Sequence, residues 1–247
     1  MARSLRLRGS SAASSRGRLV GNRLALAGTV LYFLEWVGIP FLPGTLPTDR
    51  LGHNPAATVA DYAHHPGTIA FVAGWFSVVL LGRIVFVAGL RTALSDTGHE
   101  HALADVALVV MAVSVTIEVL AYGLVAAGAW LEQAHASANS VVALDSAGSI
   151  TDKLIFGPIG VSVVTASLAM LLSRLFPRWL TWLGLIGGVL LTAAGIIASS
   201  AQGAAGSWHN VGSVLGGVPV FAVWIWMIAT SIILWRATPR TDAAPIA

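Results

Sequence analysis

The sequence contains no cysteine among its 247 residues. This absence excludes disulfide bonds, thiolate metal sites, iron–sulfur clusters and cysteine nucleophiles. Charged residues are also scarce, at 10% of the chain, whereas ordinary soluble domains carry roughly 25%. Neither a P-loop nor a glycine-rich dinucleotide fingerprint is present. Histidines in the middle of facing apolar segments are lacking too, which argues against a b-type haem site.

What the sequence has instead is apolar surface, because 56% of its residues are hydrophobic. A soluble core could not hide that much apolar surface, whereas a bilayer requires it. Six windows reach the length of about 20 residues that a membrane crossing needs. We therefore predict an all-α fold, a polytopic bundle of six transmembrane helices over residues 19–39, 68–90, 106–130, 154–175, 179–200 and 214–235.

The chain divides into three parts by composition. Residues 1–18 form a basic tail rich in serine, glycine and arginine, which we expect to be disordered. Residues 19–236 hold the six-helix transmembrane domain, and residues 237–247 form a short cytoplasmic tail. The first apolar run is long and lacks a clear cleavage site, so we expect a retained helix rather than a signal peptide.

The arginines predict the orientation of the helices. They precede the first helix and, with six spans, fall on the same side at the later inner connections. The opposite loops carry only Arg50 and Lys153 as cations. This asymmetry predicts that both termini lie in the cytoplasm. Tryptophans agree with it, at the outer ends for Trp36, Trp75 and Trp130, and at the inner ends for Trp179, Trp182 and Trp235.

Residues 176–189 read FPRWLTWLGLIGGV. This block resembles a family of small bacterial six-helix membrane proteins that is described only as a domain of unknown function. The RLALAGTVLYFLEWVGI segment of the first helix and the NPAATVADYAHHPG segment before the second belong to the same resemblance. The resemblance covers most of the chain and implies a polytopic helical protein in the bacterial cytoplasmic membrane. It implies no catalytic residues.

Two glutamates, Glu35 and Glu118, lie inside the predicted spans. A carboxylate costs a few kcal/mol in a bilayer, so it needs a partner, a polar cavity or a function. At about 1.5 Å rise per residue, both fall in the outer half of the membrane. Tyr32 shares the face of Glu35, while Ser114, Glu118 and Tyr122 form one stripe at i, i+4 and i+8. Such stripes face the interior of a bundle, because lipid offers no hydrogen-bond partner.

Two prolines are expected at the same depth as the glutamates. Pro158 in the fourth helix and Pro219 in the sixth should each bend the helix and free a backbone carbonyl. Irregular backbone at membrane depth is tolerated where it lines a polar cavity, so we predict a cavity in the outer third. The polar residues that we expect around its mouth are Asp61, His64, His65, Asn139, Asp145, Asp152, Lys153, Gln202, His209 and Asn210.

A metal site at this mouth is not expected. His64 and His65 stand beside Asp61, but adjacent histidines on a helix point about 100° apart and rarely bind one ion together. We predict no metal and no other cofactor. On the inner side, the cluster of His99, Glu100 and His101 is typical of a solvated loop.

Arg83 is the remaining charge within a predicted span, and two arrangements are open to it. Its side chain can extend to the inner surface, or it can form a salt bridge with Glu118 across an axial gap of about 10 Å. In the second arrangement Glu118 is a charged latch between helices. In the first, burial favours the protonated carboxyl group that a general acid needs.

Three functions stay open at this point. The sequence favours a binding or transport-like membrane protein, in which an acid-lined outer cavity binds a lipophilic or cationic small molecule. Alternatively, Glu35 and Glu118 act as acid and base in a membrane-embedded isomerase or cyclase that needs no cofactor. As a third option, the chain is a structural or regulatory subunit. The expected partners are membrane lipid and a lipophilic small molecule rather than nucleic acid, with self-association into a homo-oligomer as a further option.

Overall fold

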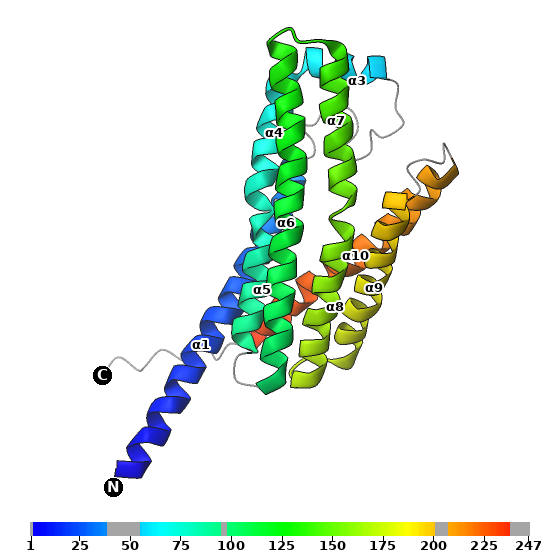
Figure 1. Ribbon diagram of the computed structural model, residues 1–247. Coiled ribbons are helices and arrows are strands. Elements are labelled where there is room, and N and C mark those ends of the chain that lie inside the picture. Colours follow the sequence, from blue (N-terminus) through cyan, green and yellow to red (C-terminus); the bar gives the residue numbers. More distant parts are fainter. Residues whose placement is uncertain (1, 39–54, 95–97, 201–206, 238–247) are drawn as a thin grey trace.

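The computed structural model describes residues 2–38, 55–94, 98–200 and 207–237, with side chains described within 17–38, 55–94, 100–197 and 217–237 (Figure 1). All regular structure in these ranges is α-helical, which confirms the all-α part of the prediction. The helices are α1 (Ala2–Phe33), α2 (Glu35–Gly38), α3 (Pro55–His64), α4 (Pro66–Val79), α5 (Leu81–Ala93), α6 (Gly98–Gln133), α7 (Ala138–Lys153), α8 (Phe156–Ser173), α9 (Arg178–Ser200) and α10 (Ser207–Arg236).

Five helical stretches are long and apolar enough to cross a membrane, among the residues that the structure describes. They are Pro66–Ala93, Glu100–Gln133, Ala138–Ser173, Arg178–Ile197 and Gly217–Arg236, so a multi-pass membrane protein is confirmed. The predicted first span continues as helix through Phe33 and then turns at Leu34, while its end at residue 39 lies outside the described residues. The backbone of α1 is helical from Ala2, so the helix also runs through most of the segment expected as a basic tail.

Glycines bring α1 and α5 into backbone contact. A Cβ atom added to Gly28 would lie 2.3 Å from the backbone of α5, and one added to Gly82 would lie 2.4 Å from the backbone nitrogen of Tyr32. Gly21 and Gly89 repeat this contact one heptad further along the two helices. Backbone atoms cannot rotate aside, so larger residues would separate the helices. Figure 1 shows α1 lying against α5 in this way.

A helix break accompanies Pro158, as its position predicts. The helix ends at Lys153 and resumes at Phe156, and the backbone nitrogens of Leu154 and Ile155 bond three residues back at 3.1 and 3.2 Å. Pro158 has no N–H to offer the carbonyl of Leu154. Pro219 behaves differently, because it lies inside α10 and the helix continues on both sides of it.

The segment 131–151, which lies between two of the predicted spans, is largely helical. The helix α7 begins after Ser137, whose hydroxyl accepts a hydrogen bond from the backbone nitrogen of Ser140 at 3.3 Å. Asp145, Ser149 and Asp152 lie on one buried face of this helix. Hydropathy fails to detect such a helix because its buried face is polar. Figure 1 shows α7 running beside α6 and continuing into α8.

The short helix α3 is held on α6 and α7 by Tyr62. Its ring is fully buried, and a Cβ atom on Gly128 of α6 would lie 3.2 Å from it. Its hydroxyl donates to the Asp145 carboxylate of α7 at 2.8 Å. This contact anchors the segment that carries Asp61 and His64, at the end of the molecule opposite the N-terminus (Figure 1).

Candidate functional site

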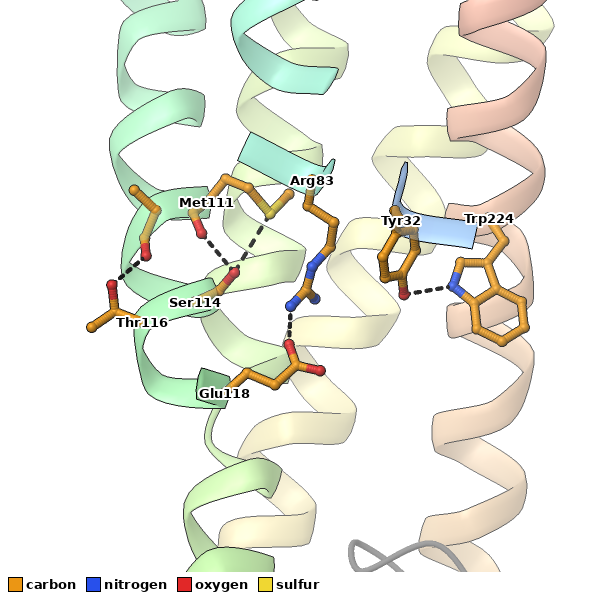
Figure 2. A network of polar contacts seen from close by, with 8 residues as sticks. Tyr32, Arg83, Met111, Ser114, Thr116, Glu118 and Trp224 are labelled. Carbon is orange, nitrogen blue, oxygen red and sulfur yellow. Dashed lines mark hydrogen bonds and ion pairs between the residues drawn. The ribbon is translucent and has the colours of Figure 1, made fainter. Parts of the chain in front are cut away.

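Arg83 of α5 and Glu118 of α6 form a buried ion pair (Figure 2). Their side chains are 6% and 7% exposed. Arginine keeps its proton in proteins, so the guanidinium needs a counter-charge wherever it is buried. Of the two arrangements open to Arg83, the structure therefore has the pair, and Glu118 is a charged latch between α5 and α6.

The position of Arg83 follows from the helix packing beside it. It lies in the first turn of α5, next to Gly82, where α5 contacts the backbone of α1. The guanidinium carbon lies 5.4 Å from the centre of the Tyr32 ring, a cation–π arrangement. Within the described residues, the Nε atom of Arg83 has no hydrogen-bond acceptor. The charge of Arg83 thus faces Glu118 on one side and an aromatic ring on the other, as Figure 2 shows.

Tyr32 connects this ion pair to α10 and to the second glutamate. Its hydroxyl accepts a hydrogen bond from Nε1 of Trp224 at 3.0 Å (Figure 2). The carboxyl group of Glu35 interacts with the same hydroxyl and with the charge of Arg83. Arg83 therefore pairs directly with Glu118 and acts electrostatically on Glu35.

The turn before Glu35 is fixed by a tryptophan of α4. Nε1 of Trp75 donates to the backbone carbonyl of Leu34 at 3.0 Å, and the same carbonyl accepts from the Val37 nitrogen at 3.0 Å. These bonds occupy a carbonyl that a continuous helix would use further along. Glu35 begins the new helix α2 and is partly buried, whereas Glu118 is buried.

Asp152 of α7 is a further buried acidic residue, and it is 4% exposed. Its charge acts on the hydroxyl groups of Tyr32 and Tyr122. The sequence predicts Asp152 at the mouth of a cavity, whereas the structure places it in the interior. We call Glu35, Glu118 and Arg83 the acidic cluster, because two acidic side chains share one basic side chain there.

The predicted stripe on α6 is buried along its whole length, since Ser114, Glu118 and Tyr122, each taken as a whole residue, are at most 5% exposed. The hydroxyl of Ser114 donates to the Met111 carbonyl of its own helix at 2.9 Å, as Figure 2 shows. The ring of Tyr122 packs against that of Phe76 on α4, with the ring centres 4.8 Å apart and the planes tilted by 56°. Of this stripe, Glu118 and Tyr122 interact with the other site residues described above.

Among the remaining mouth residues, Asp61, His64, His65 and Lys153 are partly or fully exposed. His64 and His65 are exposed, and Nδ1 of His64 lies 2.6 Å from the Ala60 carbonyl of its own helix. Nζ of Lys153 lies 6.0 Å above the Phe156 ring. No group of three or more histidine and acidic residues gathers in a metal-binding arrangement within the described part of the chain. Roles for Asp61, His64, His65 and Lys153 in ligand binding stay predictions.

The structure describes the two predicted prolines of the site but not the side chains of His209 and Gln202. Pro219 is buried and Pro158 is partly buried, each on a helix that packs in the bundle. His209 belongs to α10 by its backbone, but its side chain lies outside the described residues, as does Gln202. Their place at a ligand site also stays a prediction.

Sequence reasoning missed Trp75 and Trp224 as site residues. Trp75 was interpreted as a membrane-surface anchor, and no role was given to Trp224. The sequence does offer an indication for Trp224, because this residue lies well inside the span Gly217–Arg236. A tryptophan that anchors a helix at the membrane surface would lie near the end of the span. Trp75 gives no comparable signal, since its bond to Leu34 depends on a tertiary contact.

Comparison with known proteins identifies the sequence at the level of a family. A family model described as Domain of unknown function (DUF4386) matches residues 24–230, which include the acidic cluster and most of every span. No curated protein and no solved structure matches the sequence. The resemblance to an uncharacterised family is thereby confirmed.

Proposed function

Since this chain belongs to the DUF4386 family, a domain of unknown function, we propose a function from its own site. We propose that the protein binds or moves a lipophilic or cationic small molecule at the acidic cluster, in the outer half of the membrane. In this proposal α1 also crosses the membrane, which raises the number of spans from five to six. Both termini then lie in the cytoplasm, and the membrane is the cytoplasmic membrane of a bacterium. The arginine distribution supports that orientation.

The observation that carries the proposal is the excess of buried acid. Glu35 and Glu118 are two acidic side chains that share one buried cation, Arg83. Carboxylates that share a low-dielectric site repel one another, and a bound cation relieves that repulsion. A site with this balance favours a cationic ligand over an anionic one.

The two glutamates have different parts in this proposal. Glu118 is engaged by Arg83 and holds α5 to α6. Glu35 is only partly buried and follows a turn fixed by Trp75, so it is the carboxylate that we assign to ligand contact. The enzyme alternative is weaker, because a carboxylate held by arginine is a poor proton donor.

A structural or regulatory role is the second candidate, and the same ion pair supports it. A buried hydrogen bond between the hydroxyls of Thr29 on α1 and Ser231 on α10, which lie 2.6 Å apart, also connects two helices. If this role is correct, neither glutamate binds a ligand. Replacing Glu118 would then lower the thermal stability of the protein and change no ligand.

Mass spectrometry of organic extracts from gently purified protein tests the proposal. We expect a small molecule to co-purify with the wild-type protein and with Glu132→Gln, a control at the outer end of α6. We expect Glu35→Gln to lose it while staying folded by circular dichroism. Empty extracts from folded wild-type protein would contradict the proposal and favour the structural role.

A further inference from the structure

We infer that the ligand of this site is a lipophilic organic cation with a shielded charge, such as a quaternary ammonium or phosphonium group, and that it reaches Glu35 from the lipid across a group of aromatic rings. This inference rests on the proposed function and names the ligand class. It comes from four rings on α1, α2 and α10, which we call the ring cluster: Phe33, Trp36, Phe221 and Trp224.

Trp224 is the centre of the ring cluster. The ring centres of Phe221, Trp36 and Phe33 lie 5.1, 5.2 and 6.0 Å from its own, all in edge-to-face geometry. In an edge-to-face pair the edge of one ring covers only one face of its partner, so faces of the partly exposed rings Trp36 and Phe221 remain available. Such faces attract cations, and most strongly where water is excluded.

The ring cluster is open on the side of the molecule that faces lipid. Trp36 is 48% and Phe221 is 56% exposed, although each contacts Trp224. Between residues 217 and 235, the other exposed side chains of α10 are apolar, Val218 and Ile225 among them, as expected of a lipid-facing surface. A molecule dissolved in the bilayer can therefore touch the rings without crossing water.

The ring cluster adjoins the acidic cluster. Glu35 stands directly before Trp36 in the chain, and its carboxyl group interacts with the Tyr32 hydroxyl, which in turn accepts from Trp224. Aromatic faces followed by a carboxylate are complementary to a cation and repel an anion of the same shape.

The type of cation follows from the groups available. Ring faces supply no oxygen ligands, and Na⁺, Mg²⁺ or Ca²⁺ would need several of them to replace their hydration shells. A quaternary or aryl-substituted onium ion carries its charge behind apolar groups and binds ring faces well. The combination of ring cluster and Glu35 fits that class.

Interfacial tryptophans are common in membrane proteins, so a matched pair of residues is needed as a control. Trp179 and Trp182 on α9 are 57% and 54% exposed, about as much as Trp36. They stand beside Arg178 at the start of α9, and no carboxylate is within ten residues of them in the chain. If ordinary anchoring explains Trp36, replacing Trp182 should have the same effect.

Binding of two oppositely charged ions of the same shape tests the inference. The probes are tetraphenylphosphonium and tetraphenylborate, titrated into the full-length protein in neutral detergent and followed by calorimetry. We expect saturable binding of the phosphonium alone. Trp36→Leu and Phe221→Leu should each weaken it about fivefold, and Glu35→Gln about tenfold or more. Trp182→Leu should leave it unchanged.

The outcomes separate the inference from the proposed function. Equal affinity for both ions, or equal weakening by Trp36→Leu and Trp182→Leu, would overturn the inference. A neutral molecule that co-purifies and depends on Glu35 would also overturn it, yet would leave the proposed function standing. Trp36 and Phe221 are exposed, so their leucine variants should fold, and a Trp36→Phe variant should restore most of the affinity if ring faces bind the cation.

Discussion

At the scale of single residues, Arg83 decides how the buried charges are arranged. Its guanidinium binds Glu118, stacks on Tyr32 and acts on Glu35, so one cation organises two acids on different helices. The sequence identifies both glutamates as charges within predicted spans. It left the pairing open, because positions along α5 and α6 give an axial gap but not the direction of long side chains.

The ion pair predicts a strongly non-additive pair of substitutions. Arg83→Met should lower the free energy of unfolding by about 3 kcal/mol, because it leaves the Glu118 carboxylate buried without its partner. Adding Glu118→Leu should recover much of that loss, because no charge is then stranded. Thermal unfolding in detergent of the two single variants and the double variant measures the coupling. Losses that simply add would show that the pair is not formed.

At the scale of helices, glycine packing between α1 and α5 positions the site. Gly28 and Gly82 let the two backbones touch, which sets Tyr32 beside Arg83. The glycine spacing of α1 and α5 is visible in the sequence. The pairing of these two helices is not, because the predicted span 179–200 carries a similar glycine pattern. Similarly, the polar face of α7 hides a helix from a hydropathy argument, although Asp145, Ser149 and Asp152 recur at helical spacing.

Two glycine-to-alanine substitutions within one predicted span test this packing. Gly82→Ala should destabilise the protein by about 2 kcal/mol, because its methyl group would overlap the backbone of α1. Gly74→Ala on α4 meets no atom within 4 Å and should be neutral or slightly stabilising. Thermal unfolding of both variants in the same detergent provides the comparison. Equal stability of the two would argue against close packing of α1 on α5.

At the scale of the whole molecule, the described residues form long apolar helices of a multi-pass membrane protein, with the Arg83–Glu118 pair buried among them. The apolar windows predicted five spans that the structure confirms, since long apolar runs have few alternatives to crossing a bilayer. The turn at Leu34 was beyond prediction, because it depends on an indole from α4. The position of Asp152 was missed for a related reason, as its helix was expected to begin only at residue 154.

The absence of cysteine allows a direct test of orientation. Single cysteines are introduced at Ser11, Ser137 and Thr241, and intact cells are treated with a membrane-impermeant maleimide. We expect Ser137→Cys to react from outside, because the turn between α6 and α7 is exposed and lies on the outer side in our proposal. The other two should react only after the cells are opened. Labelling of Ser11→Cys and Thr241→Cys on opposite sides would rule out six spans.

Native mass spectrometry of the intact protein tests most directly whether Glu35 is part of a ligand site, because it measures the mass of each chain together with any bound small molecule. The wild-type protein and Glu132→Gln should each carry one added small-molecule mass per chain, and Glu35→Gln should appear at the bare mass of the polypeptide. The same added mass on folded Glu35→Gln, or bare wild-type protein, would contradict a ligand site at Glu35.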